Sequence, residues 1–313
     1  MSDMSIFSDA TDAAARVTRL TWFMIVLAAV VYAAVMAVMV VAMRRNRERD
    51  AGRVDLSDRG NRWVVVGGLI MPAIVLAAVL VAALGTMGRE RNPRPALTIH
   101  VTGHQWWWEA RYEFADLPDR FETANEIHVP VGVPVQVELT TNDVIHSFWV
   151  PQLQGKIDLI PGDTNQLRLV AKRAGTYRGA CSEFCGAEHA KMGMVVVAED
   201  SATFRQWARK ELGDAAIPTD SLAAEGKRLF ESAPCSLCHT VRGTSAKATL
   251  GPDLTHIGSR STIAAGTLPN TVGNLEAWIA NAQAIKPGAL MPTLSVFSGQ
   301  QLRAVATYVA SLK

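Results

Sequence analysis

Four side chains that could bind a soft metal ion stand close together in one stretch of the sequence. Cys181 and Cys185 are separated by three residues, His189 follows after another three, and Met192 lies three positions further on. Thiolate, imidazole and thioether ligands suit copper or zinc rather than magnesium or calcium. Because one loop rarely closes a metal site alone, a distant ligand is expected, and His146 is the best candidate.

The two cysteines of this loop have simpler interpretations. They could form a disulfide or belong to a zinc knuckle. Zinc sites seldom recruit a thioether, whereas copper electron-transfer sites do. The combination with His189, Met192 and His146 therefore favours copper, and Met194 is a competing thioether nearby.

The other two cysteines form a second motif, Cys235-Ser-Leu-Cys238-His239. The pattern C-x-x-C-H is typical of covalent attachment of a c-type haem, in which the histidine binds the iron. A redox-active C-x-x-C pair is the alternative, but the surrounding sequence lacks the βαβ pattern of such proteins, and that interpretation leaves His239 unexplained. No cysteine remains for a structural disulfide, so cysteine usage does not indicate an oxidising compartment.

Two uncharged runs, Leu20–Met43 and Trp63–Gly88, are long enough to cross a bilayer, which needs about 20 apolar residues. A signal peptide is the alternative for the first run, but its apolar core would exceed the usual length of roughly 7–15 residues. Residues 1–20 form a polar arm. Pro72 is expected to kink the second helix.

The segment between the two runs, Arg44–Arg62, carries seven arginines and four acids. Cytoplasmic loops are enriched in basic residues, so this loop is predicted to be cytoplasmic. The N-terminus and everything after Arg89 would then lie outside.

The remaining sequence divides into a β-rich and a helical part. Between Pro95 and Val197, short alternating runs punctuated by Pro and Gly predict an antiparallel sandwich or barrel. Helical patterns follow at 204–212, 222–231, 275–281 and 300–312. We predict these domains: 1–90, arm and transmembrane hairpin (helices 20–43 and 63–88); 91–212, β-domain; 213–220, linker; 221–313, helical domain.

Charge adds two expectations. The net charge of +2 argues against a nucleic-acid partner. Residues 91–214 hold 13 basic and 16 acidic side chains, and residues 220–313 hold 8 and 5, giving −3 and +3. Opposite signs favour docking of the helical domain on the β-domain.

The metal-binding loop resembles the binuclear copper (CuA) loop of cytochrome c oxidase subunit II. Three further stretches match that family: Gly103–Trp108, Asp143–Phe148 and Lys156–Gly162. With the membrane spans, this resemblance covers residues 20–210. The last ninety or so residues resemble class I cytochrome c. Together they imply a multidomain membrane protein: a two-helix transmembrane hairpin, a cupredoxin-like β-barrel and an all-α cytochrome c domain.

The resemblance also implies roles for single residues. The copper ligands would be His146, Cys181, the backbone carbonyl of Glu183, Cys185, His189 and Met192. The Glu183 side chain would help bind a magnesium ion shared with subunit I. Trp106 would be the surface point at which electrons pass toward copper.

In the cytochrome part, the resemblance implies that Cys235 and Cys238 hold the haem, with His239 and Met291 as axial ligands. Met291 is the only methionine after Met194, and a Met/His pair raises the haem potential. Gly251–Leu254 lies where this family places a proline against the axial histidine. We expect structural roles for His100, His104 and His128, and a surface or haem-edge position for His256.

The implied activity is that of an oxidase subunit in a bacterial inner membrane, multi-pass, with both cofactor domains on the periplasmic side. It would take electrons from an external cytochrome or other donor and pass them to subunit I, which reduces oxygen; subunit III is a further expected partner. The chain itself has no catalytic residue. Residues 61–66 lack the glutamate that many relatives carry at the mouth of a proton channel, which puts that proton route in doubt.

Several other functions share parts of this pattern. A CuA-containing nitric oxide reductase would use the same loop and anchor, and a free-standing membrane-anchored electron carrier would need no enzyme partner. A nitrous oxide reductase is disfavoured because its large histidine-rich domain is absent, and a quinol oxidase subunit because the copper ligands are intact.

Overall fold

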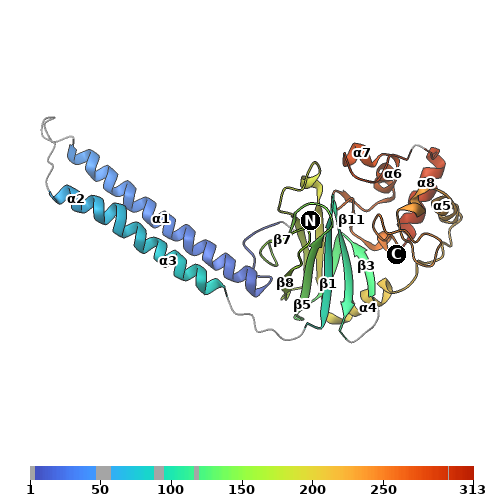
Figure 1. The fold of residues 1–313 in the computed structure, drawn as a ribbon, viewed down its shortest axis with the longest axis horizontal. Coiled ribbons are helices and arrows are strands. Elements are labelled where there is room, and N and C mark those ends of the chain that lie inside the picture. Colours follow the sequence, from blue (N-terminus) through green and yellow to red (C-terminus); the bar gives the residue numbers. More distant parts are fainter. Residues whose placement is uncertain (1–3, 47–57, 88–94, 116–119, 295) are drawn as a thin grey trace. The chain divides into compact units, whose positions relative to one another are not determined.

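The computed structural model describes residues 4–46, 58–87, 95–115, 120–294 and 296–313 (Figure 1). The chain divides into two compact units: one comprises Met1–Ala14 with Arg94–Lys313, and the other Ala15–Pro93. Each unit is described by itself.

The second unit contains the apolar helices, except for the first three residues of α1. The helical segments are α1 (Asp12–Asn46), α2 (Asp58–Val65), a π-helical turn (Val66–Ile70) and α3 (Met71–Thr86). Two continuous stretches, Asp12–Arg45 and Arg62–Thr86, are long and apolar enough to span a membrane, each with a mean hydropathy of 2.8. Both predicted spans are thus helical up to Thr86; Met87 lies beyond the end of α3, and Gly88 and most of the arginine-rich loop lie outside the described residues.

The helical geometry changes just before Pro72, where the sequence predicts a kink. The π-helical turn Val66–Ile70 ends just before it. A proline has no N–H and its ring crowds the carbonyl four residues earlier, and a wider turn relieves both problems.

The N-terminal arm is shorter than predicted and is not a free surface segment. Helix α1 begins at Asp12, and Ala10 and Thr11 are buried. The Thr11 hydroxyl donates to the carbonyl of Leu153 at 2.5 Å, and the backbone N–H of Lys172 donates to the carbonyl of Ala10 at 2.8 Å. Small side chains and backbone groups let this segment pack on the β-domain despite its polar composition.

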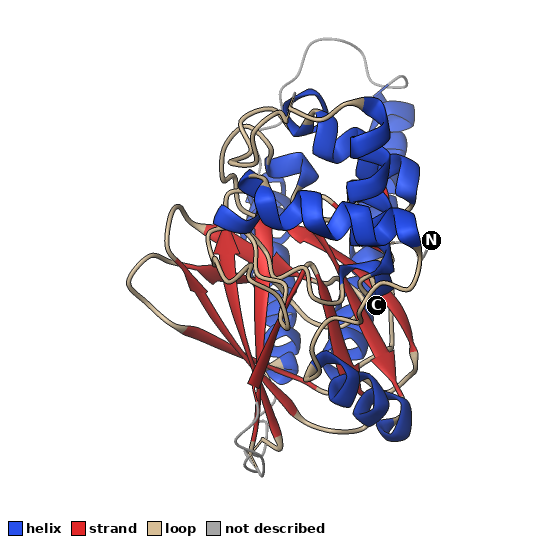
Figure 2. Cartoon of the chain, turned by 90° about the vertical axis from the view of Figure 1, so that its right-hand side faces the viewer, coloured by secondary structure: helices blue, strands red, loops and turns tan. Residues whose placement is uncertain are grey.

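Ten strands form two five-stranded sheets around one core (Figure 2). The first sheet has the order β3-β2-β1-β5-β8 and the second β4-β10-β9-β6-β7. The strands are β1 (Leu97–His104), β2 (Trp107–Phe114), β3 (Arg120–Ala124), β4 (Glu126–Pro130), β5 (Val135–Thr141), β6 (His146–Trp149), β7 (Ile157–Leu159), β8 (Asn165–Leu169), β9 (Gly175–Cys181) and β10 (Gly193–Glu199).

This architecture is the expected cupredoxin-like barrel, with one difference in pairing. Strand β1 pairs parallel with β5, and β10 pairs parallel with β4. The sequence predicted antiparallel pairs throughout, but alternation reports which side chains face the core and not the direction of the neighbouring strand. In β1, Leu97, Ile99 and Val101 point inward and alternate with half-buried residues.

Helix α4 (Ser201–Glu211) follows the barrel, capped by Asp200, whose carboxylate accepts from two backbone N–H groups. The predicted linker 213–220 connects it to α5 (Ser221–Ser232). The remaining strands and α-helices are β11 (Thr262–Ile263), β12 (Leu268–Pro269), α6 (Val272–Ala280), α7 (Ala282–Ile285) and α8 (Gly299–Ser311), and short 3-10 turns lie at His189–Lys191, Pro234–Leu237 and Ile257–Ser259.

This C-terminal helical domain has a hydrophobic core of its own, which includes Phe230, Leu275 and Tyr308. Helices α5 and α8 cross closely because Gly226 faces the backbone of Ala304: a Cβ at Gly226 would lie 2.0 Å from the Ala304 carbonyl oxygen. The expected helical domain is therefore present, with the short β-ribbon β11–β12 added.

Candidate metal and haem sites

The sequence motif with two cysteines forms the loop between β9 and β10. Cys181 is the last residue of β9, and Met192 directly precedes β10. His146 begins β6, which pairs with β9 so that Phe148 lies opposite Cys181. Strand pairing thus brings the distant histidine to the loop.

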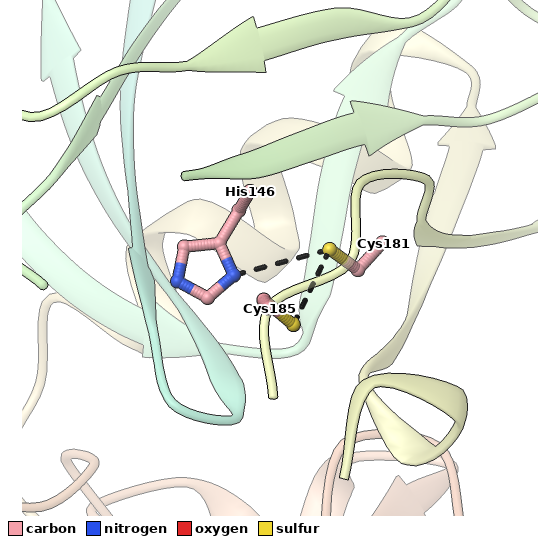
Figure 3. A group of neighbouring side chains, drawn as sticks. All are labelled: His146, Cys181 and Cys185. Atoms are coloured by element: carbon pink, nitrogen blue, oxygen red, sulfur yellow. Dashed lines mark hydrogen bonds between the residues drawn. The ribbon is translucent and has the colours of Figure 1, made fainter. Parts of the chain in front are cut away.

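The side chains of His146, Cys181 and Cys185 lie together, with their potential ligand atoms within 4.8 Å of one another (Figure 3). Cys181 Sγ lies 3.7 Å from Cys185 Sγ, 3.9 Å from His146 Nδ1 and 3.2 Å from the carbonyl oxygen of Glu183. Cys185 Sγ lies 3.5 Å from His189 Nδ1 and 3.8 Å from Met192 Sδ. Every group that the sequence assigned to the copper site therefore faces one of the two thiols.

Both cysteines are free thiols, and their separation is far above the S–S length of about 2.05 Å in a disulfide. The hydrogen bond between the two thiols lowers the pKa of Cys181 to about 3 and raises that of Cys185. One sulfur is thus readily available as a thiolate. His146 and Met192 are fully buried, and this donor set of sulfur and imidazole fits a soft metal ion.

Asp143 orients the buried histidine, a role that sequence reasoning missed. Its Oδ1 lies 2.8 Å from His146 Nε2, so an N–H at Nε2 donates to the carboxylate and leaves the Nδ1 lone pair toward Cys181. The backbone N–H of Gln105 donates to Asp143 Oδ2 at 2.7 Å. The position of Asp143 three residues before His146 is the only signal for this role in the sequence.

Two neighbouring residues occupy different environments. Met194, the competing thioether, is buried in the barrel core on β10, where it packs near Gly179. The carboxylate of Glu183 is half exposed and lies 3.8 Å from Lys156 Nζ. Its side chain can therefore reach a group outside the barrel, while its carbonyl faces Cys181.

The haem motif lines an apolar cavity in the helical domain. Cys235, Cys238, His239 and Met291 all contribute to its wall, with aliphatic and aromatic side chains such as Phe230 around them. The sequence places these four residues up to 56 positions apart, and the fold brings them to one cavity. Its apolar wall and its sulfur and imidazole groups fit a covalently attached haem.

The backbone around the cavity orients the two expected axial ligands. His239 Nδ1–H donates to the carbonyl of Pro252 at 2.8 Å, which leaves Nε2 free, and burial lowers the pKa of this imidazole. The Gln283 side-chain amide donates to the carbonyls of Ala289 and Met291 at 2.7 and 2.8 Å. These bonds shape the segment Gly288–Pro292, here called the methionine loop. No sequence signal pointed to Gln283.

Trp106 joins the two sites. Its Nε1–H donates to the carbonyl of Cys185 at 3.0 Å, and its ring also lines the haem cavity. The resemblance placed this tryptophan on the surface, but only 8% of it is exposed, because Gly288 of the helical domain lies against the ring. The surface position was therefore wrong for this chain.

The neighbouring tryptophans behave as adjacent strand residues do. Trp108 is fully buried, 6.1 Å from the ring of His146, and Trp107 stacks on His104 at 4.4 Å. The sequence therefore correctly assigned at least one of the three tryptophans to the core.

The other histidines have acidic or aromatic neighbours. His100, His104 and His128 each lie within 3.3 Å of a glutamate carboxylate. His256 was predicted at the surface or at the haem edge; it is 3% exposed and lies 3.6 Å from Glu211, so the first of these two positions was wrong. Burial lowers the pKa of His256 to about 4.

Comparisons with known proteins found relatives of both the β-domain and the helical domain. The family profile described as "Cytochrome C oxidase subunit II, periplasmic domain" matches residues 115–199, and "Cytochrome c" matches residues 223–313. A protein of Alkalihalophilus pseudofirmus called cytochrome c oxidase subunit 2 is 35% identical over 297 residues, which are 92% of this chain and 85% of that protein. The protein of that name from Bacillus subtilis is 29% identical, over 88% of this chain and 81% of its own.

Among solved structures, the periplasmic domain of cytochrome oxidase subunit II from Bradyrhizobium japonicum is similar at 34% sequence identity. The match covers 38% of this chain and 95% of that domain, with a TM-score of 0.35.

Proposed function

Because the chain belongs to the family of cytochrome c oxidase subunit 2, we propose that it carries electrons from an external donor, through a covalent haem c and a binuclear copper centre, to the oxygen-reducing subunit of a haem–copper oxidase. The observation that best supports this proposal is the position of Trp106. One indole both borders the haem cavity and donates to the backbone of the cysteine loop.

The copper centre is assigned to the six groups around the two thiols. Cys181 and Cys185 would bridge two copper ions, and the four other groups would complete the coordination: His146, the Glu183 carbonyl, His189 and Met192. Such a pair would supply one-electron transfer with little change in bond length. The buried position of His146 and its hydrogen bond to Asp143 would hold this ligand in place.

The haem would be attached through Cys235 and Cys238, with His239 and Met291 as its axial ligands. A haem with this ligand pair is a one-electron carrier of raised potential. Pro252 holds the His239 ring by its carbonyl, and Gln283 holds the backbone of the methionine loop. Trp106 would be the point at which electrons leave the helical domain for the loop Cys181–Met192, here called the copper loop.

The partners follow from the same assignment. Glu183, half exposed beside the loop, would share a magnesium ion with subunit I, and subunit III is a further expected neighbour. The two apolar helices would anchor the chain in a bacterial cell membrane, with the N-terminus and both cofactor domains on the periplasmic side. Residues 61–66 contain no acidic side chain for a proton channel, so proton uptake would use another residue or subunit.

The test is the reaction of the complex purified from native membranes. We expect a large polytopic subunit to copurify with this chain and the complex to consume oxygen when a reduced cytochrome is supplied. Consumption of nitric oxide instead would assign the chain to a CuA-containing nitric oxide reductase. Isolation of the chain without such a subunit would identify a free-standing carrier.

A further inference from the structure

Lys286 is a charged side chain of the helical domain that is buried against the barrel. Only 3% of it is exposed. Its Nζ donates to the carbonyl of Trp106 at 2.5 Å and to the carbonyl of Lys191 at 2.8 Å. Burying an ammonium group is costly unless its hydrogen bonds are made, and both acceptors belong to the other domain.

A second lysine makes the reciprocal contact. Lys191, in the copper loop, donates through Nζ to the carbonyl of Ile285 at 2.7 Å and lies 3.0 Å from Glu188. The charged or titratable groups that face Lys286 are Glu188, Lys191 and Cys185. Burial lowers the pKa of Lys286 to about 8, and Glu188 partly opposes this change.

The interface continues on either side of these lysines. The indole of Trp106 lies between two glycines: a Cβ at Gly186 would lie 3.1 Å from the ring, and one at Gly288 would lie 3.4 Å from it. Only residues without side chains allow the copper loop and the methionine loop to approach the same indole so closely.

Two backbone N–H groups also bond across the interface. That of Gly193 donates to the carbonyl of Ala265 at 2.9 Å, and that of Ser261 donates to Glu126 Oε2 at 2.9 Å. These amides are protected from exchange only while the domains are docked, so they report docking directly.

We propose that Lys286 is the positioning residue that fixes the cytochrome domain on the barrel, with Trp106 enclosed between the two. In this docked state an external protein cannot contact the indole, so a protein donor must dock on the cytochrome domain instead. The electron-transfer consequence rests on the proposed function, whereas the docking role does not.

The test is amide hydrogen exchange of the full chain, resolved at Gly193 and Ser261, in the Lys286→Met variant. We expect exchange at both amides to be at least about tenfold faster than in the unchanged protein, because the variant removes the donor that Lys286 supplies to the carbonyls of Trp106 and Lys191. The amides of Val195 and Leu275, whose acceptors lie within their own domains, should keep their rates. Lys247→Met, at an exposed lysine of the same domain, is the matched control and should change none of the four rates.

Lys286→Arg separates this role from a general loss of folding, since it keeps a donor at the same place. It should restore most of the protection that Lys286→Met removes. Unchanged exchange at Gly193 and Ser261 in Lys286→Met would overturn the proposal. So would faster exchange at all four amides that Lys286→Arg does not reverse. Neither result depends on metal or haem, so failure of this inference leaves the proposed function to its own test.

Discussion

Replacing Cys185 by serine is expected to abolish the paired-copper signal of the protein while haem c stays attached. Cys185 Sγ lies 3.5 Å from His189 Nδ1, 3.8 Å from Met192 Sδ and 3.7 Å from the other thiol. A serine hydroxyl is a hard, protonated oxygen that bridges copper poorly. Electron paramagnetic resonance and copper analysis of the purified chain would measure the loss. The oxidase activity of the purified complex should fall to background.

Met194→Leu is the matched control for the copper prediction. This thioether lies in the barrel core two residues beyond Met192, so the variant should keep its full copper content and signal. Retention of the paired-copper signal in Cys185→Ser would refute the ligand assignment, as would its loss in Met194→Leu with the fold intact.

Replacing both Cys235 and Cys238 by alanine is expected to produce the complementary defect. Without the two thiols no thioether bond to the haem can form, although His239 remains in the cavity. Haem staining of the polypeptide on a denaturing gel should be lost completely, while the paired-copper signal is retained. Oxygen consumption supported by a protein donor should fall to background, because the docked cytochrome domain covers Trp106.

Ser236→Ala tests whether that loss is specific to the thiols. Ser236 lies between the two cysteines, and its hydroxyl donates to the carbonyls of Glu231 and Ala233. This variant should keep its covalent haem. Haem staining that persists in the double cysteine variant would show that the C-x-x-C-H motif has another use.

Sequence reasoning could group the candidate ligands where chemistry fixes the residue type. Thiols, imidazoles and thioethers at short spacing have few structural uses, so Cys181, Cys185, His189 and Met192 could be grouped by residue type and spacing alone. His146 could be added because a metal site needs ligands from outside one loop. The fold brings all five together through the pairing of β6 with β9.

The supporting residues could not be predicted, because their types are common and their roles depend on the fold. Asp143, Gln283 and Lys286 act by hydrogen bonds that exist only once distant segments meet. The contacts between the helical domain and the β-domain could not be predicted for the same reason. Net charge predicted attraction between the domains, but the contacts around Trp106 are lysines that bond to backbone carbonyls, which no count of charges reveals.

The direction of strand pairing and the burial of two side chains were also predicted incorrectly. Alternation predicted the inward faces of β1 but not its parallel pairing with β5. The family resemblance implied a surface position for Trp106, and the sequence around His256 indicated a position at the surface or at the haem edge. Both are covered by elements of another domain that local sequence does not describe.

The proposed electron path requires one chain to hold both cofactors, and the metal and haem content of the purified, matured protein tests this most directly. We expect two copper ions and one covalent haem for each polypeptide. Zinc in place of copper, or a chain without covalent haem, would contradict the proposed path.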